Sequence, residues 1–177
     1  MRTLLLFRGA PGCGKSTYIK EHNLEQYVLS ADTLRLMCQS AQETPAGKLE
    51  ISPQNDDVVW EMLFKLLEVR MSHGEFTVID ATNSKTVEMN RYKNLAKQYR
   101  YRMYVIDMTD LPIDECKRRN AQREWLKRVP EAAIDKMYAR FATQKVPSGV
   151  TVLPSTTDVM SDLNYCPNDF NQWKKIH

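Results

Sequence analysis

The clearest chemistry in the sequence lies in the glycine-rich segment 9–16, Gly-Ala-Pro-Gly-Cys-Gly-Lys-Ser. It fits the pattern G-x-x-x-x-G-K-[S/T], in which glycines let backbone N–H groups turn inward around phosphate oxygens. A helix expected to begin near Lys15 would direct the positive end of its dipole at the same anion. We therefore expect this segment to bind the phosphates of ATP or another nucleoside triphosphate.

The side chains of this segment have separate expected roles. Lys15 should reach the β- and γ-phosphates, Ser16 should place its hydroxyl on Mg²⁺, and Thr17 is placed to contact the α-phosphate. Two interpretations of Cys13 are possible, a redox switch or a small residue that simply fits the turn, and the second is favoured. The residues expected to bind the nucleotide here are Gly9, Gly12, Cys13, Gly14, Lys15, Ser16 and Thr17.

Two charged residues follow the next predicted strand. Asp32 lies one or two residues past the carboxyl end of that strand, where ligands bind in doubly wound sheets. Its carboxylate could accept a proton from an attacking hydroxyl as a general base, or it could cap a helix, and spacing alone leaves both open. Arg35, three residues later, could hold a phosphate of the acceptor or lie in solvent.

A second polar group ends a later strand. Asp80 follows an apolar run, as in a Walker B element, and is expected to hold Mg²⁺ directly or through water, or to brace the loop. Asn83 is expected to contact the acceptor or to cap the next helix.

Basic residues 117–128 are predicted to form a lid. Arg119 and Arg123 are four residues apart and would share a helix face. A solvated charged face is the commoner meaning of such a run. With a phosphate-binding loop upstream, the lid is favoured because phosphoryl transfer needs positive charge on the moving group.

Short apolar runs predict buried strands of a parallel sheet. They alternate with helical patterns, which predicts an α/β fold of the P-loop NTPase type: a central parallel sheet flanked by helices, with a helical lid. The predicted strands cover residues 4–7, 27–29, 76–79 and 103–106, with a fifth at 150–153 or around Val159.

Helices are expected to start at four places, which are marked by capping residues or by proline. Residues 39–51 are polar and lack a clear period, so a mobile loop is predicted there. The expected helix starts are Ser52 with Pro53, Ser84, Asp110 and Pro130.

Composition limits the remaining possibilities. The 177 residues fit one P-loop domain, expected at 1–155, followed by an extension or linker at 156–177. Phe170 and Trp173 in this extension have no obvious place to be buried. The four scattered cysteines suggest free thiols and a cytoplasmic location, and no apolar run could cross a membrane. The net charge of +3 permits a polyanionic partner without requiring one.

Four motifs taken in order resemble the polynucleotide 5′-hydroxyl kinases, among them the bacteriophage enzyme and the kinase module of bacterial RNA-repair proteins. The resemblance covers about residues 1–145, and the last three motifs are far more specific than the first. The motifs are residues 9–17, Ser30-x-Asp32-x-x-Arg35, Asp80-Ala81-Thr82-Asn83 and Arg118-Arg119-Asn120-x-x-Arg123.

This resemblance implies roles at the matching positions. Asp32 would be the general base that activates a 5′-OH end of RNA or DNA, and Arg35 would hold the neighbouring phosphate. Arg123 would stabilise the transferring phosphate, with Arg119 as a second lid residue that binds ATP. The resemblance leaves Arg8 without a role.

In the bacterial repair proteins the kinase module precedes phosphatase and ligase modules, so such linked modules are expected as partners of this chain in a longer protein. Two alternative functions remain open. The chain could be a kinase of a sugar or nucleoside on the same scaffold, or a nucleotide-binding regulatory module without transferase activity.

Overall fold

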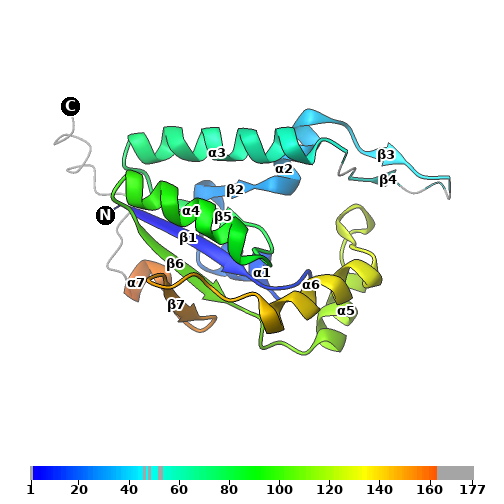
Figure 1. The fold of residues 1–177 in the computed structure, drawn as a ribbon. Helices are drawn as coiled ribbons and strands as arrows, with labels where there is room; N and C mark the ends of the chain where they lie inside the picture. The colour runs from blue at the N-terminus through cyan, green and yellow to red at the C-terminus, as the bar shows by residue number, and fades with distance from the viewer. Residues whose placement is uncertain (1, 46, 48, 52–53, 163–177) are drawn as a thin grey trace.

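The computed structural model describes residues 2–45, 47, 49–51 and 54–162. Its centre is a sheet of five parallel strands in the order β2-β5-β1-β6-β7 (Figure 1). This is the α/β architecture that the sequence predicted. The strands are β1 (Thr3–Arg8), β2 (Val28–Ser30), β5 (Thr77–Asp80), β6 (Arg102–Asp107) and β7 (Thr151–Pro154).

Strand β1 lies in the middle of the sheet, and all six of its residues are buried. Its side chains alternate between two hydrophobic cores: Leu4 and Leu6 pack into one, and Leu5 and Phe7 into the other. A strand covered on both faces needs a continuous apolar run, which explains why this segment was easy to predict.

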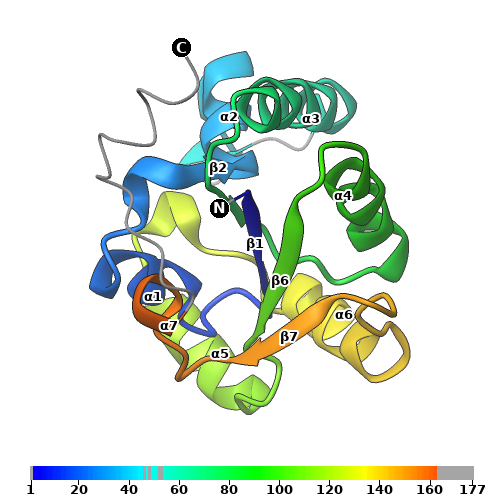
Figure 2. The same cartoon turned by 90° about the vertical axis from the view of Figure 1, so that its left-hand side faces the viewer.

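Helices cover both faces of the sheet (Figure 2). The first core is formed with α2, α3 and α4, and the second with α1, α5, α6 and α7. The helices are α1 (Lys15–Glu21), α2 (Ala31–Cys38), α3 (Asp56–Ser72), α4 (Thr86–Gln98), α5 (Ile113–Ala121), α6 (Glu131–Thr143) and α7 (Val159–Asp162), with short 3-10 turns η1 (Glu25–Tyr27) and η2 (Trp125–Lys127).

Segment 39–51 differs from the expected loop. It contains a short antiparallel ribbon of β3 (Gln42–Glu43) and β4 (Leu49–Glu50), which projects beyond the start of α3 (Figure 1). Two residues per strand are too few to show an alternating pattern, so the ribbon gave no signal in the sequence.

Two of the expected capping residues do not cap a helix. The start of α4 lies near Ser84, as expected, but Ser84 is buried and Lys85 is the N-cap. Helix α5 begins at Ile113 with Pro112 as its N-cap, so Asp110 lies two residues before the cap. Pro130 does precede α6, as predicted. Ser52 and Pro53 lie outside the described residues, and α3 begins at Asp56.

The segment after β7 folds back onto the domain. Val159 is fully buried in the second core, so the alternative fifth strand around this residue was wrong. The hydroxyl of Tyr18 in α1 donates to the carbonyl of Thr157. Residues 163–177, with Phe170 and Trp173, lie outside the described part, and the boundary at residue 155 stays a prediction. Within the described residues, no helix has the length and apolar character that crossing a membrane requires.

Candidate active site at the carboxyl edge of the sheet

The phosphate-binding loop connects β1 to α1 at the carboxyl edge of the sheet. Gly12 and Gly14 have φ angles of 85° and 107°, which residues that carry a side chain rarely adopt. A Cβ at Gly12 would lie 2.2 Å from the carbonyl oxygen of Cys116, so both conformation and space require glycine. The Nζ atom of Lys15 donates to the carbonyls of Gly9 and Ala10, each at 2.9 Å, and this closes the loop on itself.

The loop is fixed at its start by the segment after β5. The backbone N–H of Gly9 donates to the carbonyl of Thr82 at 3.1 Å. Asn83, at a φ of 44°, is buried, and its Nδ2 donates to the carbonyl of Phe7 at 2.6 Å. Lys85, not Asn83, precedes α4. Asn83 therefore braces β1 and the phosphate-binding loop, and its burial argues against the acceptor contact expected from the sequence.

Asp80 is the charged residue at the centre of this edge. Burial raises the pKa of its carboxyl group, nearby Lys15 and Arg123 lower it, and Asp32 raises it. Lys15, Asp32 and Arg123 therefore each lie close enough to Asp80 to act on its carboxyl group, although the four residues come from four segments of the chain. The structure thus places the loop lysine, the second acid and a lid arginine around Asp80.

Asp32 lies in the first turn of α2, but it does not cap that helix. The cap is Ser30, whose hydroxyl accepts from the backbone N–H of Thr33. The Asp32 side chain is 64% exposed, and its Oδ1 accepts from Nη1 of Arg35 at 2.7 Å. Of the two roles that the sequence left open, the structure removes capping and leaves the carboxylate accessible.

Arg35 is held by a partner that the sequence analysis missed. Its Nε and Nη2 donate to the two carboxylate oxygens of Asp56, at 2.7 and 3.1 Å, while Nη1 binds Asp32. Burial alone would lower the pKa of Arg35, but Asp56 and Asp32 outweigh this effect and raise it. These contacts use three of the five N–H groups, so within the described residues one on each terminal nitrogen stays available for a phosphate oxygen.

The predicted lid, residues 117–128, covers most of α5 and all of η2, and α5 lies next to the phosphate-binding loop. A Cβ at Gly14 would lie 4.0 Å from Nη1 of Arg119, which places this guanidinium beside the loop. Glu115 accepts from Nε of Arg119 at 2.6 Å and from Nε of Arg118 at 2.7 Å. Hydrogen bonds from Arg118 and Arg119 lower the pKa of Glu115 to about 2, so the carboxylate stays ionised at neutral pH.

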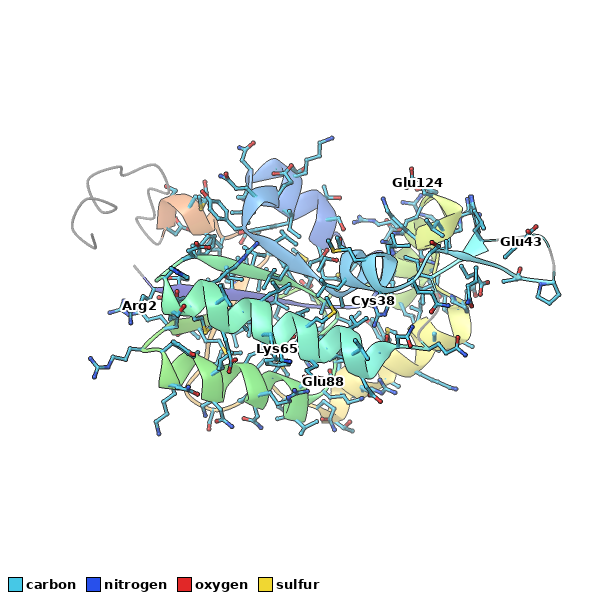
Figure 3. All side chains as sticks on the ribbon, turned by 90° about the horizontal axis from the view of Figure 1, so that it is seen from above. Arg2, Cys38, Glu43, Lys65, Glu88 and Glu124 are labelled. Carbon is cyan, nitrogen blue, oxygen red and sulfur yellow. The ribbon has the colours of Figure 1, made fainter. Side chains whose placement is uncertain are left out.

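Arg123 lies in the turn between α5 and η2, on the side of Asp80. The turn is pinned by buried Asn120, whose side chain accepts from the N–H of Val129 at 3.1 Å and donates to its carbonyl at 2.8 Å. Strand β4 contacts η2, and Figure 3 shows Glu124 near the ribbon. The ribbon and the lid therefore border the same edge of the sheet.

Arg8, which had no role in the sequence analysis, forms a buried network beside the loop. Its Nη1 binds Asp107 at 2.8 Å, and its Nη2 donates to the carbonyls of Gln144 at 2.6 Å and Phe141 at 3.4 Å. The guanidinium carbon also lies 4.9 Å from the centre of the Phe141 ring. Arg8 therefore joins the ends of β1, β6 and α6 directly before Gly9.

The available groups fit a magnesium ion bound together with a nucleotide. Among the described residues no group of three acidic, histidine or cysteine side chains could hold a metal alone. Mg²⁺ commonly takes one or two protein oxygens, and water and substrate phosphates supply the rest. The Ser16 hydroxyl and the Asp80 carboxylate, next to the phosphate-binding loop, are such a pair, and their contact with the metal stays a prediction.

Comparison with protein families decides the assignment of the chain. Residues 4–144 match a family described as an AAA domain (AAA_33). The chain belongs to this family. Its fold is that of a P-loop kinase, with a nucleotide-binding loop in the expected place between β1 and α1. No match was found among the curated proteins.

Solved structures similar to the chain include a sugar kinase and a protein bound to ADP-AlF3. A sugar kinase from Janibacter sp. HTCC2649 is 15% identical with a TM-score of 0.60, over 94% of this chain and 97% of that one. Kti12 of Chaetomium thermophilum, bound to ADP-AlF3, is 14% identical with a TM-score of 0.59, over 98% and 99%. A chain of the Pnkp1/Rnl/Hen1 complex is 24% identical with a TM-score of 0.53, over 66% and 38%. At these identities the similarity shows the fold alone.

Proposed function

We propose that this protein transfers the γ-phosphate of ATP to the 5′-OH end of RNA or DNA, as in the healing of broken nucleic-acid ends. The observation that supports the proposal is that accessible Asp32 shares with Lys15 and Arg123 the surroundings of Asp80, on whose carboxyl group all three act. In this proposal Asp32 is the base for the acceptor hydroxyl, and Lys15 and Arg123 are the cations for the transferring phosphate.

The proposed transfer is in-line. The Asp32 carboxylate accepts the proton of the 5′-OH while its oxygen forms a bond to the γ-phosphorus. The bond from that phosphorus to the β–γ bridging oxygen breaks, and ADP leaves with the electron pair. Lys15 and Arg123 offset the negative charge on the transferring group, and Mg²⁺, when bound through Ser16 and Asp80, adds further positive charge.

Arg35 favours a polynucleotide acceptor over a small molecule. It is anchored by Asp56 and paired with the proposed base Asp32, yet it retains free N–H donors. An internucleotide phosphate next to the reacting 5′ nucleoside would suit these donors. A chain of the Pnkp1/Rnl/Hen1 complex and a sugar kinase share this fold, so the comparisons leave both acceptor classes open, and a small-molecule acceptor is the second candidate.

Transfer of label from [γ-³²P]ATP onto matched acceptors tests the proposal. The acceptors are a 5′-OH RNA oligonucleotide, the same sequence as DNA, a mononucleotide and a sugar. Label on either oligonucleotide is expected, and label on the sugar alone would move the assignment to the second candidate. Arg35→Ala should raise KM for oligonucleotides far more than for the mononucleotide.

The role of Asp32 has its own test. Asp32→Ala should lower kcat about 100- to 10,000-fold, as expected for loss of a general base, with ADP binding unchanged. Asp57→Ala, which removes an exposed acid from the first turn of α3, is the matched control and should keep full activity. Near-normal turnover of Asp32→Ala would exclude this residue as the base.

Partners and location follow from the same proposal. We propose that the chain is linked to phosphatase and ligase modules in a longer protein, and that it acts in the cytoplasm. Isolation of the native protein from cells would test both proposals.

A further inference from the structure

A pocket of about 90 Å³ opens between α3 and α4, and none of the predicted site residues lines it. Figure 3 shows these two helices side by side, with Glu88 labelled on α4. A pocket of this size that is open to solvent can hold part of a planar ring. Its lining residues are Trp60, Phe64, Glu88, Arg91 and Tyr92.

The lining consists mostly of flat groups. The rings of Phe64 and Tyr92 stack with centroids 4.8 Å apart and 24° between their planes. The guanidinium carbon of Arg91 lies 4.1 Å from the centre of the Phe64 ring. Trp60 packs against the same core while staying partly exposed. Aromatic and guanidinium faces of this kind are the surfaces on which nucleobases stack.

The pocket also offers polar groups. The Tyr92 side chain is only 1% exposed, yet its hydroxyl has no hydrogen-bond partner within the described part of the chain. Buried hydroxyls are normally bonded, so this one, on a residue that lines the pocket, is a donor left without a partner in the described structure. The Glu88 carboxylate, which binds Lys85 at 3.0 Å, can accept from a ligand N–H group. One donor and one acceptor beside aromatic faces match the edge of a nucleobase.

The position of the pocket connects it with the acceptor side of the site. Helices α3 and α4 both begin at the end of the sheet where the ribbon and the lid lie (Figure 1). Asp56, which holds Arg35, is in the first turn of α3, and Trp60 follows it by four residues, one turn along the same helix face. A strand whose 5′ end reaches Asp32 and Arg35 could therefore continue past Asp56 to the pocket.

We propose that the pocket between α3 and α4 binds a nucleobase of the acceptor strand within the first few nucleotides from its 5′ end. This inference rests on the proposed function and extends it, because it makes the acceptor a polymer that is recognised by base stacking. Trp60, Phe64 and Arg91 supply the stacking faces, and Tyr92 supplies a hydrogen bond to the base edge.

The test compares single-stranded 5′-OH hexanucleotides that carry all bases with hexanucleotides that lack the bases at positions two to four. Both are made as RNA and as DNA, and the phosphates are the same in each pair. Loss of the bases should raise KM about fivefold or more in the wild-type protein, because stacking of even one base contributes at least this much. In Arg91→Ala, and to a smaller extent in Tyr92→Phe, this ratio should shrink toward one.

Val69→Ala, an exposed change near the far end of α3, is the control and should keep the wild-type ratio. Tyr92→Phe retains the packed ring, so its effect cannot be attributed to loss of folding. Equal KM values for the two hexanucleotides in the wild-type protein would overturn the pocket assignment and leave the kinase assignment standing. Absence of label on every oligonucleotide would overturn the proposed function, and the pocket assignment with it.

Discussion

Replacing Arg8 by methionine should destabilise the protein by about 3 kcal/mol. The change leaves Asp107 without its cation and the carbonyls of Phe141 and Gln144 without a donor. Breaking a buried ion pair costs about 3–5 kcal/mol, and the lower end applies because the Asp107 side chain is 25% exposed. For a chain of this size, such a loss lowers Tm by about 6–12 °C.

Urea unfolding followed by circular dichroism measures this loss directly. Arg118→Met is the matched control, because Arg118 binds Glu115 on the surface and such an exposed pair contributes little to stability. Since Arg8 precedes Gly9, ADP affinity measured by calorimetry should fall as well, and Arg8→Lys should recover only part of both losses because one ammonium cannot replace the planar fork. A loss below about 1 kcal/mol in Arg8→Met would refute the view that this network supports the loop.

Three further changes test other features of the structure. Gly12→Ala should abolish ADP binding in calorimetry, because its Cβ would meet the carbonyl of Cys116, whereas Gly149→Ala, with a φ of 71° but open space, should bind normally and lose only about 1 kcal/mol of stability. Burial raises the pKa of Tyr18 to about 12, so the unfolded phenol ionises first between pH 10 and 12 and stability falls with rising pH. Between pH 9 and pH 11, the free energy of unfolding obtained from thermal melting should fall by about 1–2 kcal/mol less in Tyr18→Phe than in the wild-type protein. Equal falls in the two proteins would contradict the assignment of this pH dependence to Tyr18. Tyr92→Phe should raise Tm by about 2–4 °C without ligand, since it removes a buried hydroxyl that is unpaired in the described structure, and a lower Tm would reveal a missed partner.

The features that were predictable from the sequence depend on local rules. The phosphate-binding loop needs glycine at φ angles of 85° and 107°, and the buried strand before it needs a continuous apolar run. Both requirements restrict residue types within a few positions. The fold class followed from the alternation of such strands with helical patterns.

Contacts between distant segments could not be predicted in the same way. Asp56 resembles any acid in a first helical turn, and only the structure shows its two bonds to Arg35 across 21 positions. The same holds for Arg8 and the carbonyl of Gln144, 136 positions away. The same holds for Ser84, which is buried one residue before the N-cap of α4, and for Asp110, which lies two residues before the N-cap of α5, so neither caps its helix.

The return of the chain onto α1 after β7 affects how the protein can be shortened. Val159 is fully buried in the core to which Tyr18 and Ile19 contribute, and it lies beyond the expected boundary at residue 155. A version ending at residue 155 would uncover this apolar surface, and exposed patches of this kind promote association between copies. A shortened protein that keeps α1 covered must therefore extend at least to residue 162, and shorter versions are expected to aggregate even though every proposed catalytic residue is retained.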